Sequence, residues 1–107
     1  MTYEIDPAVQ ALLDAANAGD LAAFLAGFTD EGVVDDWGRE FRGASRITAW
    51  SDAEFIGKRV TLAVEGVKRF GDDTVVAAQV GGDGFNGPSH FTFHVVGDRV
   101  SRMTIRA

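Results

Sequence analysis

Four strand-like segments fill the second half of the chain: residues 60–70 (VTLAVEGVKRF), 74–80 (TVVAAQV), 89–96 (SHFTFHVV) and 99–105 (RVSRMTI). Only short connections containing glycine and aspartate separate them. In the first segment Val60, Leu62 and Val64 alternate with more polar positions, as in a strand with one buried face. We therefore expect an antiparallel meander between residues 60 and 105.

The first half of the chain carries helix signals instead. Asp6 and Pro7 are typical of an N-cap and a first helical residue, and Gly19 is expected to end this helix. Asp20 caps a second helix. Its apolar residues recur at helical spacing and are Leu21, Phe24, Leu25 and Phe28. The pattern predicts two short helices that pack on the sheet.

A hairpin and a third helix are expected before the meander. Residues 32–43 favour a hairpin with its turn at Trp37-Gly38. Residues 44–56 have apolar side chains on one helical face, and Gly57 is a suitable stop. The third predicted helix therefore covers residues 44–56.

Helices followed by a long meander are typical of the α+β class. We expect the three helices of the N-terminal half to pack on a curved, mostly antiparallel sheet. Glycines in the strands allow such a sheet to bend, and here they are Gly66, Gly81 and Gly82. A length of 107 residues with 46% hydrophobic residues predicts one domain, 1–107.

Composition excludes several classes of function. The net charge of -6 disfavours binding to nucleic acid and to anionic membrane surfaces. The absence of cysteine excludes disulfides, thiolate nucleophiles and cysteine metal sites. We find no leader-like segment and no apolar run long enough to span a membrane, so we expect a cytoplasmic protein.

Four short motifs connect the chain to a known family. In order they are Ala18-Gly-Asp20, Val33-Val-Asp-Asp-Trp-Gly38, Phe41-Arg-Gly43 and His90-Phe-Thr-Phe93. In order and spacing they resemble the nuclear transport factor 2-like (cystatin-like) superfamily, and within it the SnoaL-like and ketosteroid-isomerase-like branch. The resemblance covers nearly the whole chain. It implies a cone-shaped pocket closed by helices and a homodimer formed through the sheet face.

The resemblance makes Asp36 the candidate catalytic residue. Isomerase-like members keep a carboxylate general base at this position. Because successive strand residues face opposite sides, only one of Asp35 and Asp36 can face the pocket. A carboxylate among aromatic walls is poorly hydrated and therefore accepts a proton more readily. The alternative interpretation is an ordinary hairpin turn with solvated carboxylates.

The chain departs from ketosteroid isomerases in its oxyanion donors. Those enzymes stabilise the enolate with a tyrosine and a protonated aspartate. Counting from the flanking motifs places Leu12 at the tyrosine position and Ser89 at the aspartate position. Steroid isomerisation in that form is therefore not expected. Substitute donors would be the Ser89 hydroxyl, the indole of Trp50 or Trp37, or an imidazole.

The ligand-contacting residues expected from the fold are Leu12, Phe28, Trp50, Ser89, Phe91 and Phe93. Aromatic residues at such positions also build hydrophobic cores. His90 and His94 share the opposite face of their strand, so we expect them on the outside, at the dimer interface. Their spacing of roughly 13 Å along a strand is too long for one metal ion, and no metal site is predicted.

The stretch GDGFNG at residues 82–87 matches the glycine spacing of dinucleotide-binding proteins. That fingerprint requires a following helix, and here Pro88 and a strand follow. We interpret it as a flexible strand connection, which would gate ligand access if it lies at the mouth of the cone. No cofactor is predicted.

Two functions remain open at this point. The first is an isomerase, cyclase or dehydratase that uses Asp36 as general base on a small apolar carbonyl compound. The second is a non-catalytic pocket for a small apolar molecule, or a dimeric interaction module. A carboxylate at the family position supports the first, and the missing oxyanion pair supports the second.

Overall fold

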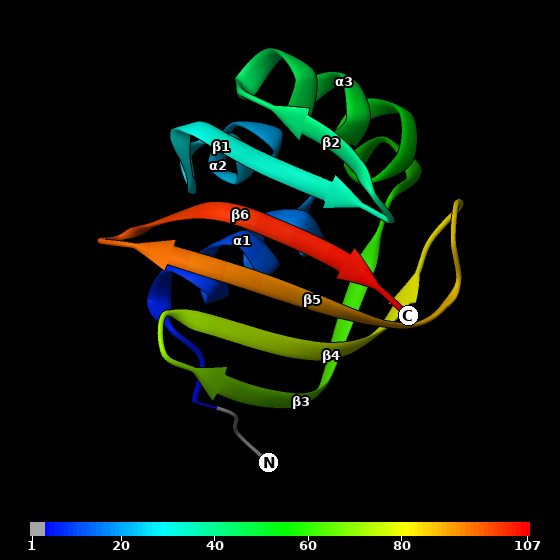
Figure 1. Cartoon of the computed structure of the whole chain (residues 1–107). Helices are drawn as coiled ribbons and strands as arrows, with labels where there is room; N and C mark the ends of the chain where they lie inside the picture. The colour runs from blue at the N-terminus through cyan, green and yellow to red at the C-terminus, as the bar shows by residue number, and fades with distance from the viewer. Residues whose placement is uncertain (1–3) are drawn as a thin grey trace.

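A computed structural model describes residues 4–107. The described chain folds into three α-helices and one six-stranded sheet, whose arrangement can be followed in Figure 1. In chain order the elements are α1 (Pro7–Ala18), α2 (Leu21–Ala26), β1 (Phe28–Asp36), β2 (Arg39–Arg42), α3 (Ala44–Glu54), the 3-10 turn η1 (Ile56–Lys58), β3 (Thr61–Phe70), β4 (Asp73–Gly81), β5 (Gly87–Val96) and β6 (Arg99–Arg106).

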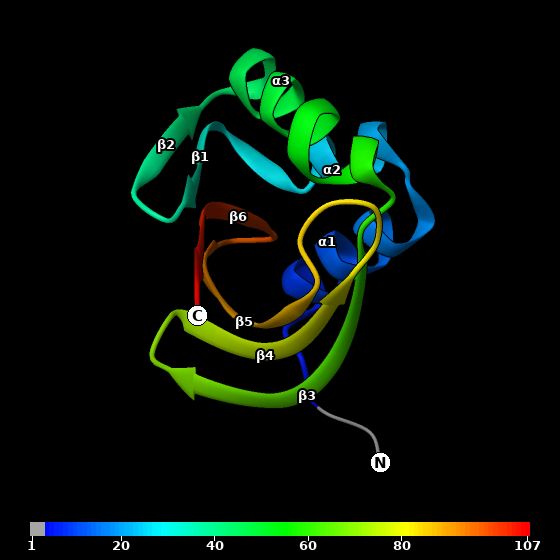
Figure 2. The same ribbon diagram turned by 90° about the vertical axis from the view of Figure 1, so that its right-hand side faces the viewer.

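The sheet is mostly antiparallel and strongly curved. Its strand order is β2-β1-β6-β5-β4-β3, and only the pairing of β1 with β6 is parallel. The helices lie on its concave side (Figure 2). This arrangement confirms the predicted α+β fold. None of the helices between residues 4 and 107 has the length and apolarity needed to cross a membrane.

The first helix begins and ends where the sequence predicts. The Asp6 side chain accepts a hydrogen bond from the Ala8 amide at 2.9 Å, and Gly19 ends the helix in the left-handed region, at φ 68°. Asn17 then joins the helix to β3. Its side chain accepts from the Leu62 amide at 2.7 Å and donates to the Leu62 carbonyl at 3.1 Å.

The core fills the space between the helices and the concave face of the sheet. Burial of apolar side chains there is the main source of stability. The largest fully buried apolar side chains are Phe24, Phe91, Phe93, Leu12, Leu13, Ile47, Met103, Val9, Val34, Val76 and Val100.

The predicted second helix was too long at its end. It stops at Ala26, and Phe28 starts β1 rather than completing a helical face. At Gly27 the backbone approaches α1 so closely that a Cβ there would lie 2.5 Å from Leu12 Cδ2. The Gly27 carbonyl accepts a hydrogen bond from the Val100 amide, which draws the chain into the sheet at this point.

The predicted third helix was also slightly too long. It ends at Glu54, and η1 follows. A Cβ at Gly57 would lie 1.8 Å from the Asp52 carbonyl oxygen, so only glycine allows this tight passage. The predicted hairpin strand, in turn, begins earlier than expected, because Phe28 already pairs with Val100 of β6, ahead of a register shift between Phe28 and Val33.

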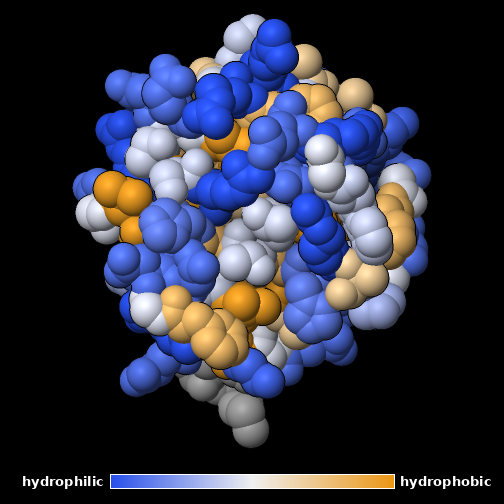
Figure 3. Space-filling view, in the orientation of Figure 1, coloured by the Kyte–Doolittle hydropathy of each residue, from blue (hydrophilic) through white to orange (hydrophobic). Residues whose placement is uncertain are grey.

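An ion-pair cluster covers the outer face of the sheet near the end of β1. Arg106 Nη1 donates to Asp35 Oδ1 and Arg102 Nη2 to Asp35 Oδ2, each at 3.0 Å, and Arg102 also pairs with Glu40. The hydrogen bond from Arg106, helped by those from the Gly38 amide and Arg102, holds the pKa of Asp35 below its usual value. Figure 3, which views this face, shows mainly hydrophilic residues.

Replacing Asp35 by asparagine should destabilise the fold in a pH-dependent way. At pH 7 the loss of charged hydrogen bonds should cost about 2 kcal/mol. The pKa of Asp35 is lower in the folded state than in the unfolded state. The stabilisation is therefore fully present at pH values above the unfolded-state pKa, and it is lost as the pH falls through the folded-state pKa. In urea unfolding, the difference in the free energy of unfolding between wild type and Asp35→Asn should therefore be smaller at pH 3 than at pH 7. Equal stability at pH 7 would contradict this account.

Candidate functional site

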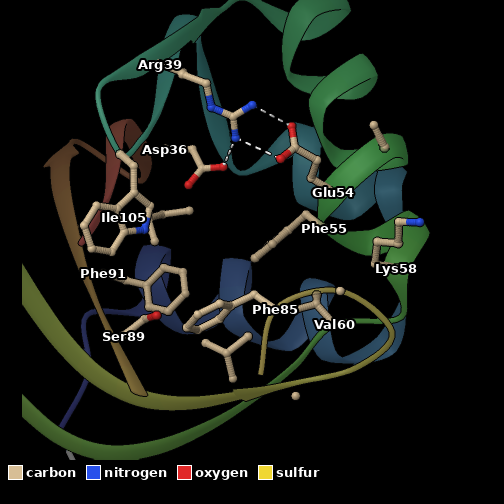
Figure 4. Close-up of a pocket in the computed structure, with 15 residues that line it drawn as sticks. Asp36, Arg39, Glu54, Phe55, Lys58, Val60, Phe85, Ser89, Phe91 and Ile105 are labelled. Atoms are coloured by element: carbon tan, nitrogen blue, oxygen red, sulfur yellow. Dashed lines mark hydrogen bonds and ion pairs between the residues drawn. The ribbon is translucent and has the colours of Figure 1, made fainter. Parts of the chain in front are cut away.

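A pocket of about 340 Å³ lies between the concave sheet, the end of α3, η1 and the β4–β5 connection (Figure 4). Most of its wall is apolar, and charged side chains gather on one side. The lining residues are Asp36, Trp37, Arg39, Ala53, Glu54, Phe55, Lys58, Val60, Val80, Gly81, Gly84, Phe85, Ser89, Phe91 and Ile105.

Asp36 is the last residue of β1, and its side chain lies on the pocket side of the sheet, 16% exposed. Its Oδ2 accepts two hydrogen bonds, from Arg39 Nη2 at 2.6 Å and from Trp50 Nε1 at 3.0 Å. Within residues 4–107, Oδ1 has no hydrogen-bond partner. One oxygen of the carboxylate is therefore fixed by protein donors, and the other is free to meet a ligand.

Arg39 is itself held by Glu54. Its Nη1 donates to Glu54 Oε2 at 2.9 Å, and its Nη2 donates to Glu54 Oε1 at 2.8 Å. The hydrogen bond from Arg39 holds the pKa of Glu54 below its usual value, and the hydrogen bond to Glu54 raises the pKa of Arg39. Asp36, Arg39 and Glu54 are thus joined by hydrogen bonds at the rim of the pocket.

The structure brings together three of the residues predicted for the site. Asp36, Ser89 and Phe91 all line the pocket. Ser89 is 3% exposed, and its hydroxyl has no hydrogen-bond partner in the described part of the chain. Trp50 lies behind Asp36 and stacks on Phe55 with ring centroids 4.8 Å apart. It therefore supports the pocket residue Asp36 through a hydrogen bond and does not itself line the pocket.

The other three predicted residues lie elsewhere. Leu12 is in the core, where it contacts Gly27. Phe93 is buried beside Phe91, with ring centroids 6.4 Å apart. Phe28 packs edge-on against Phe24 and lines a smaller cavity next to α2 and α3. Their contact with a ligand stays a prediction.

Several lining residues were not foreseen from the sequence. Arg39 follows Asp36 by three residues across a tight turn, and this spacing could have indicated the ion pair. Glu54 lies fifteen residues further on, and no local pattern connects it to Arg39. In the sequence, the apolar residues Phe55, Val60 and Ile105 cannot be told from ordinary core residues.

The β4–β5 connection lies at the mouth of the pocket and is tied down at several points. Asp83 pairs with Arg59 at 2.7 Å, and its amide donates to the Lys58 carbonyl. The Asn86 side chain donates to the carbonyls of residues 82 and 84. Phe85 lines the pocket although it is 59% exposed. The glycine-rich stretch therefore presents an aromatic ring to the mouth.

Both histidines lie on the outer face of the sheet. His94 Nδ1 lies 2.6 Å from Asp73 Oδ1, and His90 Nδ1 lies 3.0 Å from the Ala107 carbonyl oxygen. Neither lines the pocket. In residues 4–107, no three side chains of histidine, cysteine, aspartate or glutamate converge as a metal site requires.

Solved structures similar to this chain share its fold. A Sinorhizobium meliloti protein described as a "putative polyketide cyclase" is 24% identical, with TM-score 0.84 and coverage of 95% of each chain. A Mycobacterium tuberculosis protein in complex with estradiol-17beta-hemisuccinate is 18% identical, with TM-score 0.81 and coverage of 94% of this chain and 90% of that one.

A third similar structure is a hypothetical protein from Catenulispora acidiphila with a ketosteroid isomerase-like fold, in complex with trimethylamine. It is 21% identical, with TM-score 0.81 and coverage of 97% of this chain and 87% of that one. No curated protein matches the chain. The family model of the SnoaL-like domain matches residues 9–103. The chain therefore belongs to the SnoaL-like domain family.

Proposed function

We propose that this chain binds a small, largely apolar carbonyl compound in the pocket and that Asp36 acts on it as general base. The observation that carries the proposal is the geometry of Asp36. Arg39 and Trp50 hold one carboxylate oxygen, and the other has no protein partner on the pocket side. Such an arrangement presents one defined proton acceptor to a ligand.

The walls suit the apolar body of such a compound. Phe55, Val60, Val80, Phe91 and Ile105 surround the space beside Asp36. Pockets for small molecules are mainly apolar, with a few polar groups that fix orientation. Away from its charged side, the pocket therefore offers apolar contacts to the body of the ligand.

The proposed step is the transfer of a proton from the carbon next to the carbonyl group to Asp36 Oδ1. The electrons of the broken C–H bond form a carbon–carbon double bond, and those of the carbonyl π bond move to its oxygen. The Ser89 hydroxyl, unpartnered within the described chain, donates to this oxygen as charge develops. If the ligand carries a C=C bond conjugated with the enolate, return of the proton to the far carbon of that bond gives an isomer. Attack of the enolate carbon on a second carbonyl group in the same ligand forms a C–C bond and an alkoxide, which takes the proton back from Asp36 to give a cyclised product.

Two of the similar structures support a ligand of this class. One holds a steroid ester and another is described as a cyclase, and both share the fold at TM-scores above 0.8. A second candidate function is binding without chemistry. The observation that favours it is the ion pair of Asp36 with Arg39 at 2.6 Å, because a neighbouring cation stabilises the carboxylate.

Binding should depend on Asp36. In a thermal-shift screen of ketones, lactones, sterols and aromatic polyketides, a compound at 100 times its Kd should add about 2.7 kcal/mol, or about 10 °C in Tm. Asp36→Asn should change the shift for a compound that binds there. Asp30→Asn, a fully exposed aspartate of the same strand, is the matched control and should leave it unchanged. Equal shifts in all three proteins would contradict a ligand contact at Asp36.

Proton abstraction should be visible without knowledge of the product. Incubation of a binding compound with the protein in D2O should replace its hydrogens next to the carbonyl by deuterium, measured by proton NMR. Asp36→Asn should slow this exchange about 100-fold or more, since general base catalysis typically contributes 10²–10⁴. Binding with no exchange above the rate in buffer would support the second candidate instead.

We also propose that a second copy of the chain covers the outer face of the sheet. That face carries both arginines and carboxylates, so it is compatible with the self-complementary contact of a two-fold dimer. Light scattering should give twice the chain mass of 11.4 kDa. Thr92→Arg, in the middle strand pair of that face, should give the single mass. A wild-type protein of 11.4 kDa would contradict the dimer.

A further inference from the structure

Glu54 fixes the direction from which Arg39 approaches Asp36. The two prongs of the Arg39 guanidinium donate to the two oxygens of Glu54, and Nη2 also donates to Asp36 Oδ2 (Figure 4). A guanidinium is planar, so binding one edge of it determines where its remaining N–H groups point. Glu54 comes from α3 and Asp36 from β1, and they are joined here through Arg39 of β2.

Trp50 supplies the second direction. Its ring is 3% exposed and stacked on Phe55, so the indole N–H that donates to Asp36 Oδ2 is held by packing. Arg39 of β2 and Trp50 of α3 both donate to Asp36 Oδ2, and together they fix the plane of the carboxylate. Oδ1 is then the oxygen left for the pocket.

Glu54 also changes what the charge of Arg39 does to Asp36. An arginine alone beside Asp36 would stabilise the carboxylate and weaken it as a proton acceptor. Glu54 places a second carboxylate on the same guanidinium, at 2.8 Å. The positive charge of Arg39 is then shared between two carboxylates instead of acting on Asp36 alone.

We infer that Arg39 and Glu54 are positioning residues for Asp36, and that Glu54 acts through Arg39 alone. Arg39 aims the carboxylate so that Oδ1 faces the ligand, and Glu54 both orients Arg39 and offsets its charge. The effect on rate rests on the proposed role of Asp36 as general base. The aiming of the carboxylate can be measured without any ligand.

The first experiment follows the Trp50 indole N–H by NMR. The chain holds two tryptophans, so Trp37→Phe assigns the two indole peaks. Arg39→Gln and Glu54→Gln should each move the Trp50 peak, because both disturb its acceptor. The double variant should match Arg39→Gln, since Glu54 has no route to Asp36 once Arg39 is absent. An unmoved peak in both single variants, or an added effect in the double variant, would overturn the inference.

The second experiment measures deuterium exchange in a bound carbonyl compound against pH. Glu54→Gln should lower the maximal rate about tenfold to a hundredfold through misplacement of Asp36. It should also move the half-maximal rate to lower pH, because the charge of Arg39 is no longer offset. Arg39→Lys should retain the wild-type pH dependence more closely than Arg39→Gln, because an ammonium group keeps the positive charge. It should not recover the wild-type rate, because an ammonium group lacks the planar fork of the guanidinium.

Glu40→Gln and Arg42→Gln are the matched controls. Both residues lie on β2 beside Arg39, Glu40 pairs with Arg102 on the outer face, and Arg42 bonds the Glu31 carbonyl. They should change neither the indole peak nor the exchange. If the exchange rate depends on Asp36 but is the same in wild type and Glu54→Gln, the inference about Glu54 is overturned and the proposed function still stands. Absence of exchange in the wild type would remove the proposed function, and the indole peaks would still decide whether Arg39 and Glu54 aim Asp36.

Discussion

Two adjacent carboxylates end β1, and the alternation of a strand sends them to opposite sides of the sheet. Each meets arginine there. Asp35 is bound on the outer face by Arg102 and Arg106 of β6, the strand that pairs in parallel with β1. Asp36 is bound on the inner face by Arg39, across the turn. A slip of one residue would exchange the two carboxylates between faces, so the site depends on this register.

The rest of the fold builds an apolar space around the inner carboxylate. The curved sheet supplies Ser89, Phe91 and Ile105 from β5 and β6, while the end of α3 supplies Glu54 and the β4–β5 connection brings Phe85 to the mouth. Figure 4 shows the charged chain on one side of the pocket and aromatic rings facing it. In the proposed function, this separation of a fixed carboxylate from a mostly apolar wall is what gives one carboxylate oxygen a distinct chemical role.

Local patterns predicted most of the elements, because alternation in strands and capping at Asp6 and Gly19 depend on neighbouring residues alone. The same patterns failed at Phe28, which fits a helical face but starts a strand once the Gly27 carbonyl bonds β6. Placing Ser89 and Phe91 on one face followed from alternation. The contact of Glu54 with Arg39 did not, because it exists only after α3 has folded across the hairpin.

The central claim is that Asp36 Oδ1 is aimed at a bound carbonyl compound. The most direct measurement is a crystal structure of the wild-type protein with a compound from the thermal-shift screen. We expect Oδ1 about 3–3.5 Å from the carbon next to the carbonyl group. We expect Ser89 Oγ about 2.7–3.1 Å from the carbonyl oxygen. A compound bound in the pocket with its carbonyl group turned away from both residues, or bound outside the pocket, would contradict the account.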